Sequence, residues 1–347
     1  MRHINIPIFI PHLGCPNDCV FCNQRRISGK QEFDIRSVEG ELERAVSTID
    51  YRSCEVEIAF FGGSFTGIDR GDMVYLLSLA KRYIDAGKAQ AVRLSTRPDY
   101  IDGEILDILG RYGVTDIELG IQSMSDRVLS ASRRGHTAEC SRRACRMITD
   151  RGFNLVGQMM IGLPESTIDD EIRTAREISE MCGAARIYPT VVFRDTDLCG
   201  MTESGNYLPL TLEDAVRRSE AALNVFIEHH IPVIRLGLCA ADNLFEPGAI
   251  AGGAYHSAVG EMVYAEHYYR VMRDYIEKNH LRDDISGKNI VIEVPKGEVS
   301  KVSGQKRANK LRLQNEYNVK NVRIIENPEL FWYNIRMRAD WRVDASV

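Results

Sequence analysis

The strongest constraint on the fold of this chain is a regular alternation, from residue 4 to residue 192, between short apolar runs and longer amphipathic stretches. Short apolar runs bounded by turn residues indicate buried strands, and apolar residues that recur every three or four positions indicate helices. Strands that alternate with helices predict a parallel sheet. We predict strands over 4–11, 56–62, 92–96, 116–121, 155–161 and 185–192, with helices over 37–48, 73–86, 101–112, 138–150 and 168–181.

The spacing of the strands and the loop after the first one indicate how this sheet closes. The strands recur roughly every 30–40 residues, and no glycine-rich dinucleotide fingerprint follows the first one. We therefore predict an α/β fold with a partial (β/α)6 barrel of the TIM type over residues 1–195, with a doubly wound sheet as the alternative. In such a barrel the carboxyl ends of the strands meet at one mouth, where functional side chains gather.

Residues 196–285 are predicted to extend the barrel. Thr211, with Asp214 three residues later, can cap a long helix that runs to His230. A strand over 231–238, a loop rich in glycine and alanine over 247–255 and a helix over 257–277 complete this extension.

Residues 286–347 are predicted to form a small βαβ tail with an unusual charge. Strands are expected over 289–294 and 319–325, with a helix over 305–317 between them. The chain carries a net charge of +5 from Ile285 onward and −10 before it. A basic appendage on an acidic protein indicates a polyanionic partner.

Composition excludes several classes of protein. Hydrophobic residues make up 44% and charged residues 27% of the 347 residues, which is ordinary for a globular protein and excludes disordered or fibrous classes. The apolar stretch Ile4–Ile10 is broken by Pro7 and is too short for a membrane span or a secretory signal. Nine cysteines without such a signal favour reduced thiols and a cytoplasmic location, with no membrane partner.

The most specific motif is Cys15-Pro-Asn-Asp-Cys19-Val-Phe-Cys22, directly after the first predicted strand. Three thiolates this close together can bind three irons of a [4Fe-4S] cluster and leave the fourth iron open. An open iron can chelate S-adenosylmethionine and pass it one electron, which yields a 5′-deoxyadenosyl radical. Two alternatives are a zinc site completed by His12, and three unrelated buried cysteines.

This triplet, with Phe21 before its last cysteine, resembles the radical S-adenosylmethionine (SAM) superfamily. The resemblance implies that the glycine motif after the second strand receives the amino group of the methionine moiety, since adjacent glycines let backbone atoms approach a ligand. It also implies that Ser95 and Gln122 lie near the ribose, that Arg97 or Arg134 meets the carboxylate, and that the segment with Gln158 flanks adenine. The implied cofactor-binding residues are Gly62, Gly63, Ser64, Ser95, Arg97, Gln122, Arg134 and Gln158.

A narrower resemblance covers roughly residues 5–260. Residues 95–100, 118–123, 134–137, 187–190 and 247–256 together resemble the radical half of the Elongator catalytic subunit and its bacterial relatives, which modify the wobble uridine of transfer RNA. The resemblance does not extend to the acetyltransferase domain of that subunit or to its basic N-terminal arm. It implies S-adenosylmethionine, transfer RNA and an electron donor such as flavodoxin or ferredoxin as partners.

The remaining cysteines form no second metal motif, and Cys239, at the end of a predicted strand, is our candidate for a catalytic radical or methyl carrier. In the tail, the glycine turn that opens the cationic helix is similar to the GxxG turn of KH-type RNA-binding units, with Arg307 in place of the second glycine. Lys306, Arg307 and Lys310 are predicted to share one side of that helix and to bind RNA. The alternative is a helix that is merely solvated.

Three functions therefore compete at this point. The first is a radical enzyme that acts on an RNA base, most simply in transfer RNA. The second is a radical enzyme that acts on a small molecule or a peptide, with the tail as a lid or a dimer contact. The third is a zinc-stabilised RNA-binding protein without catalysis.

Overall fold

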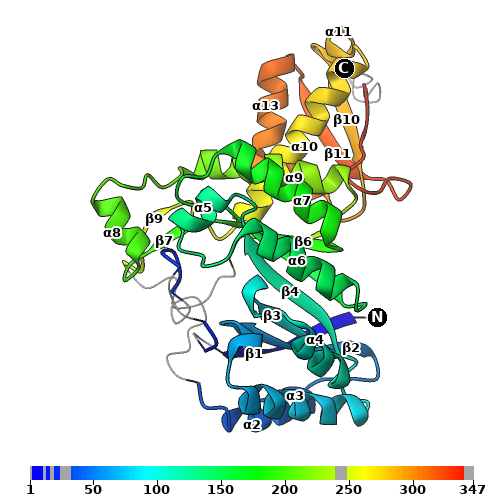
Figure 1. Cartoon of the computed structure of the whole chain (residues 1–347). Helices are drawn as coiled ribbons and strands as arrows, with labels where there is room; N and C mark the ends of the chain where they lie inside the picture. The colour runs from blue at the N-terminus through cyan, green and yellow to red at the C-terminus, as the bar shows by residue number, and fades with distance from the viewer. Residues whose placement is uncertain (1, 11–12, 16–18, 24–32, 239–247, 340–347) are drawn as a thin grey trace.

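The computed structural model describes residues 2–10, 13–15, 19–23, 33–238 and 248–339. Its centre is a sheet of seven parallel strands in the spatial order β1-β2-β3-β4-β5-β6-β8, which curls into a partial barrel (Figure 1). The prediction of an α/β partial barrel is thus confirmed. The strands are β1 (Arg2–Ile10), β2 (Cys54–Gly62), β3 (Ala91–Thr96), β4 (Val114–Gln122), β5 (Asn154–Ile161), β6 (Ala184–Pro189) and β8 (Val233–Leu236).

Helices cover the outer face of this sheet and build the main core with it (Figure 1). In β2, Val56, Ile58 and Phe60 are fully buried on the helix side. Glu57, between them in sequence, points to the inner face because side chains alternate along a strand. The outer helices are α2 (Ser37–Ser47), α3 (Arg70–Asp85), α4 (Gly103–Arg111), α6 (Ala138–Thr149), α7 (Ile168–Met181) and α9 (Leu212–Glu228).

The apolar run 185–192, predicted as one strand, forms two. β6 ends at Pro189, and β7 (Val191–Phe193) leaves the barrel to pair antiparallel with β9 (Ile250–Gly253). Proline has no backbone N–H to donate to a further ladder bond, so the run breaks there. The strand predicted over 231–238 is β8, which pairs with β6 and adds a seventh strand to the six predicted.

Short elements complete the mouth of the barrel. They are the helix α5 (Asp126–Ala131), the helix α8 (Asp197–Glu203) and the 3-10 turns η1 (Phe65–Gly67) and η2 (Pro98–Tyr100). Each follows the carboxyl end of a strand, so together they surround the site described below. Within the described residues, no helix is long and apolar enough to cross a membrane.

The tail has a three-stranded sheet rather than the two predicted strands. β10 (Asn289–Val294) lies between β11 (Asn321–Glu326), which is parallel to it, and β12 (Arg336–Ala339), which is antiparallel. The helix predicted over 305–317 is wrong at its start. The chain forms α12 (Val299–Ser303), a 3-10 turn η4 (Gln305–Arg307) and then α13 (Ala308–Tyr317).

One long helix joins the barrel to the tail. α10 (Val259–Lys278) contributes Val259 and Val263 to the barrel core and Tyr268, Met272 and Ile276 to the core of the tail. A short helix α11 (Arg282–Ile285) follows it. Figure 1 shows α10 running upward from the barrel beside α13. Because both cores include the same helix, the position of the tail on the barrel is set by packing.

Candidate functional site

The cysteine triplet lies in the loop that follows β1, at the mouth of the barrel. Cys19 is buried, and Cys15 and Cys22 are partly buried. Two backbone hydrogen bonds hold the middle of this loop: the Val20 N–H donates to the Ser132 carbonyl at 3.2 Å, and the Leu198 N–H donates to the Val20 carbonyl at 2.8 Å. The elements after β4 and β7 therefore fix the loop from two sides.

The glycine motif after β2 packs directly against the cysteine loop. A Cβ on Gly63 would lie 2.1 Å from the Leu13 carbonyl oxygen, and one on Gly14 would lie 2.2 Å from the Ser64 carbonyl oxygen. Gly62 has a φ of +116°, which disfavours side chains. These glycines thus let the two loops touch backbone to backbone. Ser64, the next residue of the motif, is buried and its hydroxyl accepts a hydrogen bond from the Arg97 N–H at 3.2 Å.

Arg97 and Arg134 both reach the cysteines. Arg97 Nη1 lies 3.9 Å from Cys15 Sγ, and Arg134 Nη1 lies 3.4 Å from Cys19 Sγ. Both arginines are almost fully buried. Arg97 and Arg134 are the two residues that the sequence offers for binding the methionine carboxylate. The structure places both of them next to the triplet.

The two arginines differ in which donors remain free. Asp99 occupies the fork of Arg97, because its two oxygens accept from Nε at 2.9 Å and from Nη2 at 2.7 Å. Although burial opposes it, the hydrogen bonds and the charge of Arg97 hold the pKa of Asp99 below its ordinary value. Arg134 donates Nη2 to the Gly120 carbonyl at 2.7 Å, and its buried Nε has no partner within the described residues.

Further polar atoms near the mouth are buried without a partner in the described part of the chain, among them Gln122 Oε1 and His136 Nε2. Gln122 ends β4 with a φ of +66°, an uncommon conformation for a residue other than glycine. Burial, followed by the charge of Arg134, lowers the pKa of His136 to about 4, so this imidazole is neutral at pH 7. Buried polar groups are normally satisfied, so this group of unpaired atoms indicates a polar ligand.

Ser95 and Gln158 lie deeper in the barrel than Gln122, beside Glu118, which precedes Gln122 by four residues in β4. Both donate to Glu118 Oε2, Ser95 Oγ at 3.5 Å and Gln158 Nε2 at 2.9 Å. The other oxygen of Glu118 accepts from Arg93 at 3.3 Å and Arg186 at 2.5 Å. Glu118 is 1% exposed, so this network is a buried ionic floor beneath the mouth.

A three-thiolate iron–sulfur cluster fits these residues. The described residues contain no group of three His, Cys, Asp or Glu side chains close enough to hold one metal ion. The corners of a cubane are separate irons, so three thiolates need not converge on one point. Thiolates are soft donors that suit iron–sulfur clusters, and the two arginines beside them suit the negative charge of such a cluster. The unpaired polar atoms nearby suit a polar ligand bound to it.

Two sequence candidates fall on residues whose placement the structure does not describe. Cys239, the proposed radical or methyl carrier, and His12, the candidate fourth zinc ligand, both lie outside the described ranges. In contrast, Asp99, His136 and Glu118 take part in the site although the sequence analysis did not select them. The sequence signal for Asp99 and Glu118 is that they lie in segments 95–100 and 118–123, two of the segments that carry the narrower resemblance.

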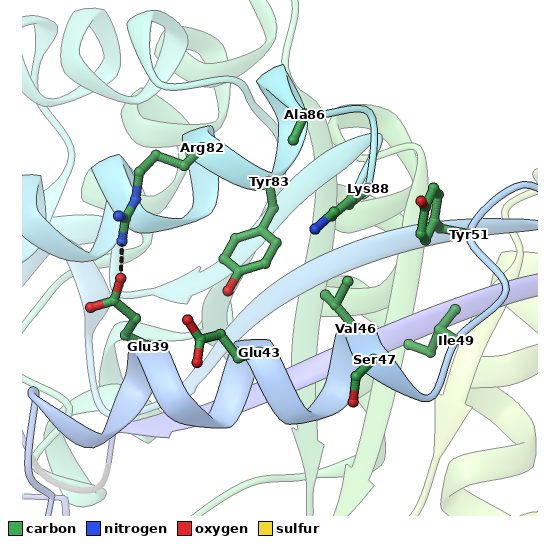
Figure 2. A pocket seen from close by; sticks show the side chains of 10 residues that line it. All are labelled: Glu39, Glu43, Val46, Ser47, Ile49, Tyr51, Arg82, Tyr83, Ala86 and Lys88. Carbon is green, nitrogen blue, oxygen red and sulfur yellow. Dashed lines mark hydrogen bonds and ion pairs between the residues drawn. The ribbon is translucent and has the colours of Figure 1, made fainter.

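The described residues also form a cavity away from this site. It is a groove of about 460 Å³ between α2 and α3, lined by Glu39, Glu43, Tyr51, Arg82, Tyr83, Lys88 and neighbouring side chains (Figure 2). The lining comes mainly from the carboxyl ends of these helices and the residues just beyond them, where β2 and β3 begin. The groove therefore lies at the opposite end of the strands from the cysteine triplet.

The predicted RNA-binding residues lie in and after the turn between α12 and α13. Lys306 and Arg307 have left-handed backbone angles and precede α13, so the prediction that they share a helix face with Lys310 is wrong. Gly304, with a φ of +72°, ends α12 and reverses the chain there. Lys306 and Arg307 are exposed, and none of the three cations has a side-chain partner that we can identify within the described residues.

This turn is attached near the mouth end of α10. Asn309 is buried and donates to the Ala265 carbonyl at 2.7 Å and to the Val302 carbonyl at 3.1 Å. Ala265 lies six residues after Val259, the first residue of α10. At about 1.5 Å per residue the turn is therefore about 9 Å along the helix from its beginning. A Cβ on Gly260 would lie 2.8 Å from the Leu236 carbonyl, so α10 begins at the carboxyl end of β8.

Comparison with known proteins agrees with this geometry. Residues 9–178 match the model of the Radical SAM superfamily, and residues 183–270 match that of the Radical_SAM C-terminal domain. The chain belongs to the radical SAM superfamily of enzymes. Within it, the chain is homologous to the radical-SAM region of Elongator complex protein 3.

Individual relatives define the extent of this homology. The chain is 26% identical over 294 residues to the tRNA uridine(34) acetyltransferase of Methanocaldococcus jannaschii, covering 72% of this chain and 53% of that protein. It is 33% identical over 138 residues to Elongator complex protein 3 of Schizosaccharomyces pombe, covering 38% of this chain and 25% of that protein. The chain thus spans about half or less of the length of these relatives.

A solved structure shares the fold. The Elp3 of the archaeon Methanocaldococcus infernus, with an N-terminal deletion, superposes with a TM-score of 0.57 at 22% identity and covers 80% of this chain and 63% of that one.

Proposed function

We propose that this chain holds a [4Fe-4S] cluster on Cys15, Cys19 and Cys22, cleaves S-adenosylmethionine reductively and modifies a base in transfer RNA. The observation that carries the proposal is the cluster of unpaired polar atoms beside three thiols at the mouth of a radical SAM barrel. When bound, the cluster supplies the electron that breaks the sulfonium bond and releases a 5′-deoxyadenosyl radical. A flavodoxin or ferredoxin would deliver that electron, and the reaction would take place in the cytoplasm.

The residues around the triplet would orient the cofactor. Arg134 is the better candidate for the methionine carboxylate, because its Nε is buried and unpaired whereas Asp99 occupies the fork of Arg97. The unpaired Gln122 Oε1 can accept a hydrogen bond from a ribose hydroxyl. Gly62 and Gly63 hold the glycine motif against the cysteine loop, and backbone carbonyls of the motif would accept from the amino group. Gln158 would lie beneath the adenine.

Replacing Gln122 by Ala should weaken S-adenosylmethionine binding by about tenfold, the equivalent of one hydrogen bond of about 1.4 kcal/mol. Thermal stability should stay nearly unchanged, because Gln122 Oε1 has no partner to lose within the described chain. Equilibrium dialysis with the reconstituted protein measures the first quantity and a thermal melt the second. Ser95→Ala is the comparison: its hydroxyl already lies 3.5 Å from Glu118, so we expect a smaller effect. A large loss of stability with normal affinity in the Gln122 variant would show a structural role.

Transfer RNA is supported as substrate by the relatives and by the tail. A relative that spans 72% of this chain is named a tRNA uridine(34) acetyltransferase. The acidic barrel repels a polyanion, whereas the three cations lie next in sequence to Asn309, which bonds to α10 about 9 Å along the helix from its first residue. The acyl transfer in that name is not part of the proposal, because the region of homology is the radical half.

Neutralising Lys306, Arg307 and Lys310 together by Gln should lower transfer RNA affinity and flatten its dependence on salt. Each lost phosphate contact removes about 0.7–0.9 from the slope of log K against log salt. Filter binding at several salt concentrations measures this slope. Cleavage of S-adenosylmethionine in the absence of RNA should not change, because the cysteine triplet lies in the barrel and not in the tail.

The matched control for the tail is Arg336→Gln with Arg338→Gln. These β12 arginines already pair with Glu329 at 3.1 Å and Glu293 at 3.4 Å, so their loss should affect RNA binding less. If the triple variant binds transfer RNA with the affinity and salt dependence of the parent, the tail does not bind RNA. A small-molecule or peptide substrate then becomes the better proposal.

A further inference from the structure

Two buried arginines point hydrogen-bond donors at two different thiols of the triplet. Arg134 Nη1 lies 3.4 Å from Cys19 Sγ, and Arg97 Nη1 lies 3.9 Å from Cys15 Sγ. The two side chains come from different strand ends, Arg97 after β3 and Arg134 after α5. They also touch each other, because Arg97 Nη2 donates to the Arg134 carbonyl at 2.8 Å. The contacts to sulfur therefore belong to one connected structure.

Each guanidinium is held in this orientation by other groups. Arg97 is clamped by both oxygens of Asp99, which sits in the 3-10 turn η2, and its Cζ lies 5.6 Å from the ring centroid of Tyr100. These anchors leave Nη1 directed at Cys15.

Arg134 is held by the Gly120 carbonyl, and it fits there only because residue 120 has no side chain. A Cβ on Gly120 would lie 2.6 Å from Arg134 Nη2. Gly120 thus both accepts a hydrogen bond from Arg134 and leaves room for it.

From this geometry we infer that Arg97 and Arg134 raise the reduction potential of the cluster by donating N–H···S hydrogen bonds to Cys15 and Cys19, with Asp99 and Gly120 as the groups that position them. The inference rests on the proposed cluster. A hydrogen bond to a ligating thiolate withdraws electron density from the sulfur, so the iron accepts an electron more readily. A cation in a buried site also stabilises the additional negative charge of the reduced cluster.

This assigns the two arginines a role that exists before S-adenosylmethionine binds. In that state one electron passes from an added low-potential reductant to the oxidised cluster, with no bond made or broken. The midpoint of this step can therefore be measured without the cofactor and without turnover.

The test is a potentiometric titration of the reconstituted full-length protein without S-adenosylmethionine, followed by the electron paramagnetic resonance signal of the reduced cluster. We expect Arg97→Gln and Arg134→Gln each to lower the ratio of reduced to oxidised cluster at a fixed potential by about tenfold, which for one electron is a midpoint shift of about 59 mV. Arg97→Lys and Arg134→Lys keep the charge without the guanidinium geometry. They should shift the midpoint in the same direction by less.

Gly120→Ala separates hydrogen bonding from charge. It changes no charge but pushes Arg134 away, so the midpoint should fall as in Arg134→Gln, by a smaller amount. Arg133→Gln is the control, because it removes a positive charge from the same segment. The Arg133 side chain is 62% exposed and pairs with Asp197 at 2.5 Å. The midpoint potential of this variant should therefore equal that of the parent.

The outcomes are distinct. If the parent binds no iron, the proposed function fails. If the variants bind about four irons and have the same midpoint potential as the parent or as Arg133→Gln, the inference fails and the proposed function stands. If the Gln variants lose the cluster, the Lys variants and Gly120→Ala decide: a lowered midpoint supports the inference and an unchanged one overturns it.

Discussion

Alanine in place of Cys15, Cys19 or Cys22 should reduce the cleavage of S-adenosylmethionine to the level of a protein-free control. Each substitution removes one thiolate ligand from the proposed cluster. Within the described residues no group of three His, Cys, Asp or Glu side chains could hold a metal ion in its place. The measurement is the yield of 5′-deoxyadenosine from protein reconstituted and reduced without oxygen, together with the iron content of each variant.

Cys54→Ala is the matched control for these variants. Cys54 is a partly buried free thiol at the start of β2, at the other end of the same sheet. The control should keep both iron and cleavage, which shows that alanine at a cysteine is not itself disruptive. Retained cleavage in all three triplet variants would falsify the ligand assignment. Zinc without iron in the parent would favour the zinc-stabilised RNA-binding protein instead.

The barrel was predictable because its signal is repeated. Each strand such as 56–62 is an apolar run too short for a helix, and each intervening segment has the spacing of an amphipathic helix. The start of α9 was predicted accurately from its cap residue. Thr211 accepts from the Asp214 N–H at 3.1 Å, as the sequence indicates.

Elements that owe their existence to tertiary contacts were missed. The strands β9 and β12 have four residues each and carry no periodic pattern of their own. The turn at Lys306 and Arg307 was predicted as helix, because both residues favour helices and neither favours a left-handed conformation. Gly304 was the available signal, since glycine commonly ends a helix, and here it ends α12 just before this turn.

The candidate site was also predictable only where its features are local in the sequence. The spacing of Cys15, Cys19 and Cys22 is local, so the sequence alone specifies the type of cluster that they suit. Which of the two arginines keeps a free donor depends on side-chain geometry: Asp99 accepts from Arg97 Nε and Nη2, whereas Arg134 Nε has no partner within the described residues. The sequence therefore left Arg97 and Arg134 as alternatives, whereas the unpaired Nε favours Arg134.

The ionic floor of the barrel was also invisible in the sequence. Polar residues inside strands were interpreted as facing the mouth, but several of them bind one another beneath it. Ser95 and Gln158 both contact Glu118, which in turn binds Arg93 and Arg186. These contacts join strands β3, β4, β5 and β6, so the layer that supports the site depends on a single carboxylate.

Replacing Glu118 by Gln should lower the free energy of unfolding by about 3–5 kcal/mol, the range seen when one partner of a buried ion pair is removed. Arg93 keeps Glu57 at 2.8 Å and Asp116 at 3.0 Å. Arg186 loses the one carboxylate that we find bonded to it in the described chain, and its Nε already has no partner there. The effect should therefore come mainly from an uncompensated Arg186. Denaturation by urea, followed by circular dichroism, measures it.

The origin of this loss can be tested with a double variant. If the unpaired charge of Arg186 is the cause, Glu118→Gln with Arg186→Met should recover at least about 1 kcal/mol relative to Glu118→Gln alone, since removing both members of a buried pair is often close to neutral. Glu139→Gln is the surface comparison: its pairs with Arg142 and Arg146 are exposed, and no measurable change is expected. If the losses of stability caused by Glu118→Gln and Arg186→Met simply add in the double variant, Glu118 acts through Ser95 and Gln158 instead. The floor would then stabilise the mouth by hydrogen bonds rather than by charge, and S-adenosylmethionine affinity should fall with stability in the single variant.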